Sequence, residues 1–201
     1  MNSLFGTEPQ YGDGAFKYGE IFGHFVWDTR DKSRLPLRGQ YLQLSGSYFP
    51  VMLDNRHHFA DGMLDLRVYL PLHPSMTLAL RGMGRKIWGY FPFFHAAYIG
   101  GKSTLRGFSR ERFAGDAAVL ATAELRALLG SVRLFFPGEW GLTAFTDAGR
   151  VFNGDESSRQ LHTGAGGGAW VAVLDRRLAL NLQVAFSRER VAFYAKTGFT
   201  F

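Results

Sequence analysis

The sequence lacks cysteine and lacks any long apolar run. An absence of cysteine suits a compartment in which stray thiols would be oxidised. Charged, polar or glycine residues interrupt every stretch that approaches the length of about 18 apolar residues, which excludes a membrane-spanning helix. No basic region with an apolar core follows Met1–Phe5, so we expect an exported protein in its mature or trimmed form.

The composition is rich in glycine and aromatic residues. The 201 residues include 25 glycines, 15% aromatic and 46% hydrophobic residues, which is unlike a disordered chain or a helical membrane protein. The formal net charge is +6, but the 23 Lys and Arg residues are scattered among strand-like segments, so we expect no nucleic-acid partner. In hydrocarbon, a closed β-barrel is the other way to satisfy backbone polar groups.

Period-two alternation is the dominant pattern along the chain. In 178–187, leucine, valine and phenylalanine alternate with small or polar residues, as expected for a strand with lipid on one side and a wet lumen on the other. Short and long connections alternate, and aromatic residues gather near strand ends, as in the interfacial girdles of membrane barrels. The predicted strands are 16–28, 37–49, 58–70, 75–84, 116–127, 141–152, 162–173, 177–188 and 191–201.

A long connection covers residues 85–115, and connections of that length are usually functional. It contains Gly101-Lys102-Ser103, but a phosphate-binding loop needs glycine where Ala96 stands and a helix afterwards, so we reject nucleotide binding. The glycines of 164–168 are interpreted as space for a wall aromatic or for the loop, and not as a cofactor cradle, because no helix follows.

Two further kinds of site are set aside. Adjacent His57 and His58 on a strand would point to opposite faces, and with Asp54 they lack a regularly spaced third ligand. No Gly-x-Ser-x-Gly elbow anchors a hydrolase triad. We therefore expect no catalytic, cofactor-binding or metal-binding residues, no cofactor, and no enzyme activity.

Four motifs, in this order, carry a family resemblance. They are 28–31 with 36–39 (Asp-Thr-Arg-Asp and Pro-Leu-Arg-Gly), 105–108 (Leu-Arg-Gly-Phe), 123–126 (Ala-Glu-Leu-Arg) and 145–152 (Phe-Thr-Asp-Ala-Gly-Arg-Val-Phe). The chain resembles the BamA-type bacterial surface antigen superfamily of outer-membrane β-barrels, also called the outer-membrane-protein-85 superfamily, over roughly residues 20–201. The match covers the C-terminal half of that barrel.

The resemblance implies a loop folded into the barrel, with an Arg-Gly-Phe tip against acidic residues of the wall. The implied residues of this loop-wall lock are Arg106, Gly107, Phe108, Glu124 and Asp147. It also implies a C-terminal export signal of Tyr194, Phe199 and Phe201, although Lys196 stands where the family tends to have glycine.

Elementary chemistry supports the lock independently of the family. A guanidinium is always charged and presents a planar fork of donors, so in a confined lumen it needs carboxylate partners. Alternation places Glu124 with Leu120, Thr122 and Arg126, and Asp147 with Gly149, whose small size leaves room for a loop. The alternative is that Arg106 is a solvated loop residue and both acids pair locally, with Arg126 and Arg150.

We therefore predict an all-β fold: an antiparallel transmembrane β-barrel with about eight or nine strands in this chain, partial or small, and a long inward-folding loop. Residues 1–15 form a lead-in and 16–201 the barrel domain, with 85–115 in the lumen. The expected location is a bacterial-type outer membrane, and the expected function is insertion, assembly or translocation of polypeptides.

The expected partners are the lipid bilayer, a polypeptide substrate, and a second copy or another chain that completes the barrel. The alternatives are a structural barrel or anchor without transport activity and, less favoured, a soluble β-sandwich enzyme. We also expect Phe199 and Phe201 to face lipid with Phe193, Leu180 and Leu182, and Lys196, Gln183 and Asn181 to face the lumen.

Overall fold

A computed structural model describes residues 11–133, 137–154, 160–174, 176, 178–199 and 201. Nine strands form one antiparallel sheet in the order β1-β2-β3-β4-β7-β8-β9-β10-β11, and β5 with β6 forms a small second sheet. The strands of the large sheet are β1 (Ile21–Asp28), β2 (Gly39–Phe49), β3 (Phe59–His73), β4 (Met76–Gly89), β7 (Ala117–Arg133), β8 (Pro137–Phe152), β9 (His162–Val173), β10 (Leu178–Ser187) and β11 (Val191–Thr197).

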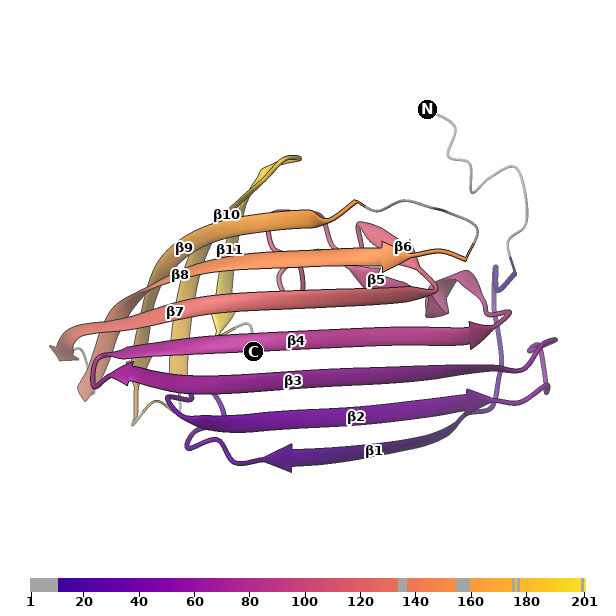
Figure 1. Cartoon of the computed structure of the whole chain (residues 1–201), viewed down its shortest axis with the longest axis horizontal. Helices are drawn as coiled ribbons and strands as arrows, with labels where there is room; N and C mark the ends of the chain where they lie inside the picture. The colour runs from indigo at the N-terminus through magenta and orange to yellow at the C-terminus, as the bar shows by residue number, and fades with distance from the viewer. Residues whose placement is uncertain (1–10, 134–136, 155–159, 175, 177, 200) are drawn as a thin grey trace.

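The large sheet is curled, so that β9 turns over at the top beside β8, and β10 and β11 pass behind β7 and β8 in Figure 1. The segment between β4 and β7 lies inside this curve and contains the 3-10 helix η2 (Phe93–His95), β5 (Ala97–Ile99) and β6 (Phe113–Gly115). Within the described chain β1 and β11 pair with one neighbour each, so the sheet is open and does not close into a ring.

All nine strands predicted from the sequence are present, with different ends. β1 begins at Ile21 instead of residue 16, and β4 continues to Gly89 instead of ending at 84. The predicted turn at 71–74 is tighter, because β3 continues to His73 and pairs it with Met76. Alternation alone does not fix strand ends, since the pairing continues as long as the partner strand supplies backbone groups.

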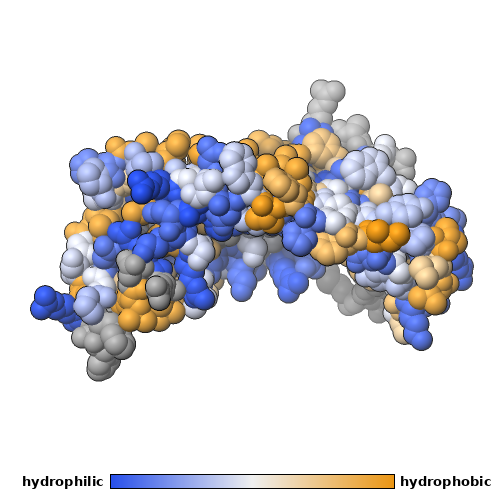
Figure 2. All heavy atoms as spheres, turned by 90° about the horizontal axis from the view of Figure 1, so that it is seen from below, coloured by the Kyte–Doolittle hydropathy of each residue, from blue (hydrophilic) through white to orange (hydrophobic). Residues whose placement is uncertain are grey.

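The two faces of the sheet differ in polarity, as the alternation predicted. On β10, Asn181 and Gln183 are buried on the concave face, whereas Leu180 and Leu182 on the convex face are about half exposed. Phe193 of β11 is 82% exposed. Seen from the β1 side, the left half of the molecule shows hydrophilic residues between two hydrophobic margins (Figure 2).

The prediction that Phe199 and Phe201 face outward is wrong. Gly198 has a positive φ of 83°, and its N–H donates to the carbonyl of Ala179, so the last strand ends there and the chain turns to the concave face. Phe199 packs beside Trp170, and Phe201 is only 6% exposed, against Tyr69 and Ala79. Strand periodicity cannot anticipate this bend.

Two absences concern the described residues alone. They include no helix long and apolar enough to cross a membrane. They also include no group of three or more histidine, cysteine or acidic residues arranged to hold a metal ion.

Candidate functional site

The inserted segment between β4 and β7 packs against the concave face through a shared apolar cluster. β5 and β6 form a short hairpin stem, with Ala97 opposite Gly115 and Ile99 opposite Phe113. Ile99, Leu105 and Phe108 of the segment are buried with residues of the sheet, among them Phe49, Phe59, Ile87, Ala118 and Leu120. Burial of these side chains holds the segment to the wall independently of any charge.

The tip of the segment is a compact turn that presents Arg106. The N–H of Gly101 donates to the carbonyl of Leu105, and Thr104 Oγ1 donates to the carbonyl of Gly100. Gly107 has a φ of 91°, which side chains rarely tolerate, and it reverses the chain directly after Arg106. The Arg106 side chain is thereby directed into the wall and is 0% exposed.

Asp147 of β8 is the principal partner of Arg106. Arg106 Nε donates to Asp147 Oδ2 at 2.8 Å and Nη2 donates to Oδ1 at 2.8 Å, a bidentate pair. The backbone N–H of Arg106 also donates to Asp147 Oδ2, at 3.0 Å. The guanidinium carbon lies 3.3 Å from the ring centroid of Phe145, so the planar cation stacks on an aromatic face.

The remaining guanidinium nitrogen joins two more strands. Arg106 Nη1 donates to Glu124 Oε2 of β7 at 2.7 Å and to Gln183 Oε1 of β10 at 3.2 Å. Burial opposes the charged form, but the hydrogen bonds and charge of Asp147, with the charge of Glu124, outweigh it and raise the pKa of Arg106 above its usual value. One side chain therefore ties the tip to three strands as a permanent cation.

Glycines make room for this arrangement. A side chain at Gly164 of β9 would place its Cβ 2.1 Å from the carbonyl oxygen of Arg106, and at Gly166 it would lie 2.7 Å from the Phe145 ring. At Gly149 a Cβ would lie 2.9 Å from the Ile99 side chain. The predictions that these glycines admit a wall aromatic and an incoming loop are confirmed.

Glu124 connects the tip to the C-terminal residues. Arg126 Nε donates to Glu124 Oε1 at 2.9 Å, and Arg126 Nη2 donates to the carbonyl of Phe201 at 3.2 Å. The Arg126 guanidinium also lies 4.0 Å from the Phe199 ring centroid. The sequence left two alternatives for Glu124: a contact with Arg106 of the loop, or a local pair with Arg126. In the structure Glu124 contacts both arginines. Arg150 lies on the opposite face from Asp147.

The other site residues lie close to the tip. Phe108 is buried with its ring centroid 5.2 Å from that of Phe113. The N–H of Gly107 donates to Tyr194 Oη at 3.0 Å, and Ser187 Oγ donates to the carbonyl of Gly107 at 2.8 Å.

Sequence reasoning missed the tip contacts of Gln183, Ser187 and Lys196. Lys196 faces inward, as predicted, and its Nζ donates to the carbonyl of Lys102. All three alternate with the outward residues of β10 and β11, which was the available signal. Alternation predicts which face of the sheet a side chain lies on, but it does not predict which residue that side chain contacts.

The rejected sites have ordinary surroundings. Asp54 Oδ2 accepts a hydrogen bond from the backbone N–H of Lys17, and the His57 ring packs edge-on against Tyr90. Gly101-Lys102-Ser103 lies in the turn at the tip, with no helix after it.

A comparison with protein families agrees with this geometry. The model described as the Omp85 superfamily domain matches residues 9–201.

Proposed function

Because the chain belongs to the Omp85 superfamily, we propose that it is the outer-membrane barrel module of a machine that inserts, assembles or translocates polypeptides, without covalent chemistry. Members of this superfamily are outer-membrane proteins of bacteria and organelles, and their general role is the insertion or translocation of proteins. Such a function needs a shaped barrel wall and an element that gates or braces it. No reacting group is required.

The convex face supports a position in the bilayer. Its outward side chains on β3 and β10 are chiefly leucine, and Leu64, Leu66 and Leu180 are 43%, 42% and 50% exposed. The strands of the large sheet reach 17 residues in β7, and about 9–11 tilted residues suffice to cross the hydrocarbon core. The backbone groups of the interior strands are paired within the sheet, as hydrocarbon demands.

The observation that carries the proposal is the burial of Arg106 at 0% exposure between Asp147 and Glu124. An unpaired buried charge is costly, so Arg106 is stable in this position only while the strands hold its acidic partners around it. The inserted segment is thus a built-in brace of the concave face, and it lies where a polypeptide passing along that face would meet it. This contact is the centre of the loop-wall lock.

The two edge strands of the sheet, β1 and β11, need further strands to pair with if the chain lies in a membrane. Unpaired backbone groups of β1 and β11 would each cost several kcal/mol in hydrocarbon. We propose that strands outside the described residues, from a second copy, another chain or further sequence of the same protein, pair with these edges and complete the barrel.

The proposal is tested in phospholipid vesicles that contain the purified protein in its full-length natural form. An unfolded outer-membrane β-barrel is added, and its insertion is followed by protease protection. The proposed function predicts faster insertion than in empty vesicles, and slower insertion with Arg106→Met than with the unaltered protein. A rate equal to that of empty vesicles, from a chain that is itself inserted, would favour the alternative of a structural barrel or anchor.

A further inference from the structure

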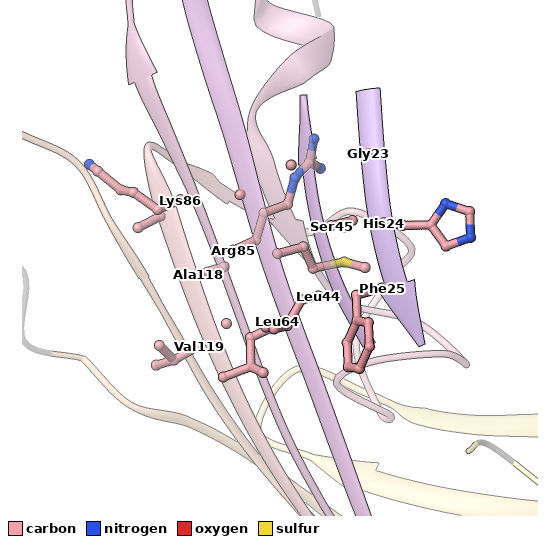
Figure 3. A pocket seen from close by; sticks show the side chains of 15 residues that line it. Gly23, His24, Phe25, Leu44, Ser45, Leu64, Arg85, Lys86, Ala118 and Val119 are labelled. Atoms are coloured by element: carbon pink, nitrogen blue, oxygen red, sulfur yellow. The ribbon is translucent and has the colours of Figure 1, made fainter. Parts of the chain in front are cut away.

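The convex face contains a hollow of about 700 Å³ that spans β1, β2, β3, β4 and β7 (Figure 3). Its lining includes two adjacent outward rows. One row contains Gly23, Gly46 and Gly62, which are paired in register, and the other contains Phe25, Leu44, Leu64, Gly84 and Val119. We call this hollow the outer groove. These two rows are glycine or apolar, and the row between them, with His24, Ser45, Met63, Arg85 and Ala118, also borders the hollow.

The outer groove has a cation at one end. Lys86 lies in the glycine row, opposite Gly62 on β3 and Ala117 on β7. Within the described part of the chain, no hydrogen bond or ion pair of its ammonium with another residue occurs. Arg150 on β8 is a second outward cation, opposite Val119, with its guanidinium 4.4 Å from the Phe152 ring centroid.

No carboxylate described on the same face pairs with Lys86. The outward residues described on β3, β4, β7 and β8, over 60–70, 78–88, 117–127 and 142–152, include Lys86 and Arg150 and no acidic residue. A cation on a lipid-facing wall is expensive unless an anion approaches it. An anion for Lys86 is therefore expected from another molecule.

Aromatic residues mark the level of the cations. Trp88, which is 54% exposed, follows Lys86 on the same face, and its ring lies 3.0 Å from the place of a Cβ at Gly62. Tyr48, opposite Ile21 in the next outward row, is 46% exposed. Tryptophan and tyrosine favour the level of the headgroups, where lipid phosphates lie.

We propose that the outer groove binds an anionic, phosphate-bearing membrane lipid. Its acyl chain lies over the glycine floor between Phe25, Leu44 and Leu64, and its phosphate pairs with Lys86. A lipid matches an apolar groove with positive charge at one end, because it is apolar along most of its length and anionic at one end. This proposal rests on the proposed position in a membrane.

The test uses quenching of Trp88 by lipids with brominated acyl chains. The protein carries Trp27→Phe and Trp140→Phe, which leaves Trp88 exposed and Trp170 buried, and is placed in vesicles with brominated phosphatidylglycerol or brominated phosphatidylcholine at equal mole fraction. We expect the anionic lipid to be preferred at Trp88 by about fivefold, as one cation near a charged lipid would give. Lys86→Gln should bring the preference close to one.

A pair of glycine substitutions separates the groove from the general lipid contact. A Cβ at Gly84 or at Gly82 meets nothing within 4 Å, so both positions accept leucine, but only Gly84 lines the groove. Gly84→Leu should weaken the preference, and Gly82→Leu should leave it unchanged.

Equal quenching by the two lipids in the parent protein, a preference that survives Lys86→Gln, or equal effects of the two glycine variants would overturn the proposal. Absence of quenching by either lipid would show that the chain is not in the bilayer, and would instead overturn the proposed function.

Discussion

Replacement of Arg106 by methionine is expected to destabilise the protein, and the cost should arise more from Asp147 than from Glu124. Arg106, Asp147 and Glu124 are each 0% exposed, so the variant leaves buried carboxylates without their shared cation. Breaking such a pair costs about 3–5 kcal/mol. Glu124 keeps a second guanidinium, that of Arg126 at 2.9 Å, whereas the charged partner of Asp147 is Arg106 itself.

This asymmetry can be measured with double variants. Added to Arg106→Met, Asp147→Asn should restore a large part of the lost free energy of unfolding, because it removes the orphaned charge. Glu124→Gln should restore little, and it should strand Arg126. The assay is urea-induced unfolding in detergent micelles, followed by tryptophan fluorescence. Equal rescue by the two substitutions, or an Arg106→Met midpoint equal to that of the parent, would refute the reasoning.

Three further predictions concern β9, β10 and the inserted segment. Gly164→Val should displace the tip from β9 and lower the free energy of unfolding by about 1–3 kcal/mol, because its Cβ would meet the carbonyl of Arg106; a Tm equal to that of the parent would contradict this. A cysteine at Leu182 on the convex face should react faster with a lipid-soluble maleimide than a cysteine at buried Gln183, and faster reaction at Gln183 would reverse the facing of β10. Burial, with help from the charge of Arg85, lowers the pKa of His95, so stability is full above the usual pKa of 6.5 and declines as pH falls through the lower folded value; a His95→Phe variant should lose this dependence, as pH-jump unfolding would show.

The sequence predicted the sheet well because alternation is a local property. Each outward leucine on β10 alternates with a small or polar inward residue, and that pattern fixes the facing of the strand wherever one side is apolar. The bend at Gly198 was missed for the opposite reason. A single glycine in a strand fits a bulge, a bend or a close approach equally well, and the aromatic surroundings of Phe201 come from distant strands.

The loop-wall lock was accessible in part. The order of the motifs and the faces of Glu124 and Asp147 pointed to the acids of the wall, and the structure places both within hydrogen-bond distance of Arg106. The contacts of Gln183 and Tyr194 were inaccessible, because they depend on how far the sheet curls. No pattern within a single strand encodes that curvature. The outer groove was missed likewise, since its glycines lie on separate strands and meet only through register.

Hydrogen exchange at the tip of the inserted segment is the most direct test of the central claim, that this segment is docked on the wall in the membrane-embedded protein. The amide of Arg106 donates to Asp147 and that of Gly107 donates to Tyr194 Oη. In vesicles, both amides should exchange at least about a hundredfold more slowly than in an unstructured peptide, and Asp147→Asn with Tyr194→Phe should remove most of the protection. Exchange at the unstructured rate in the unaltered protein would contradict the account.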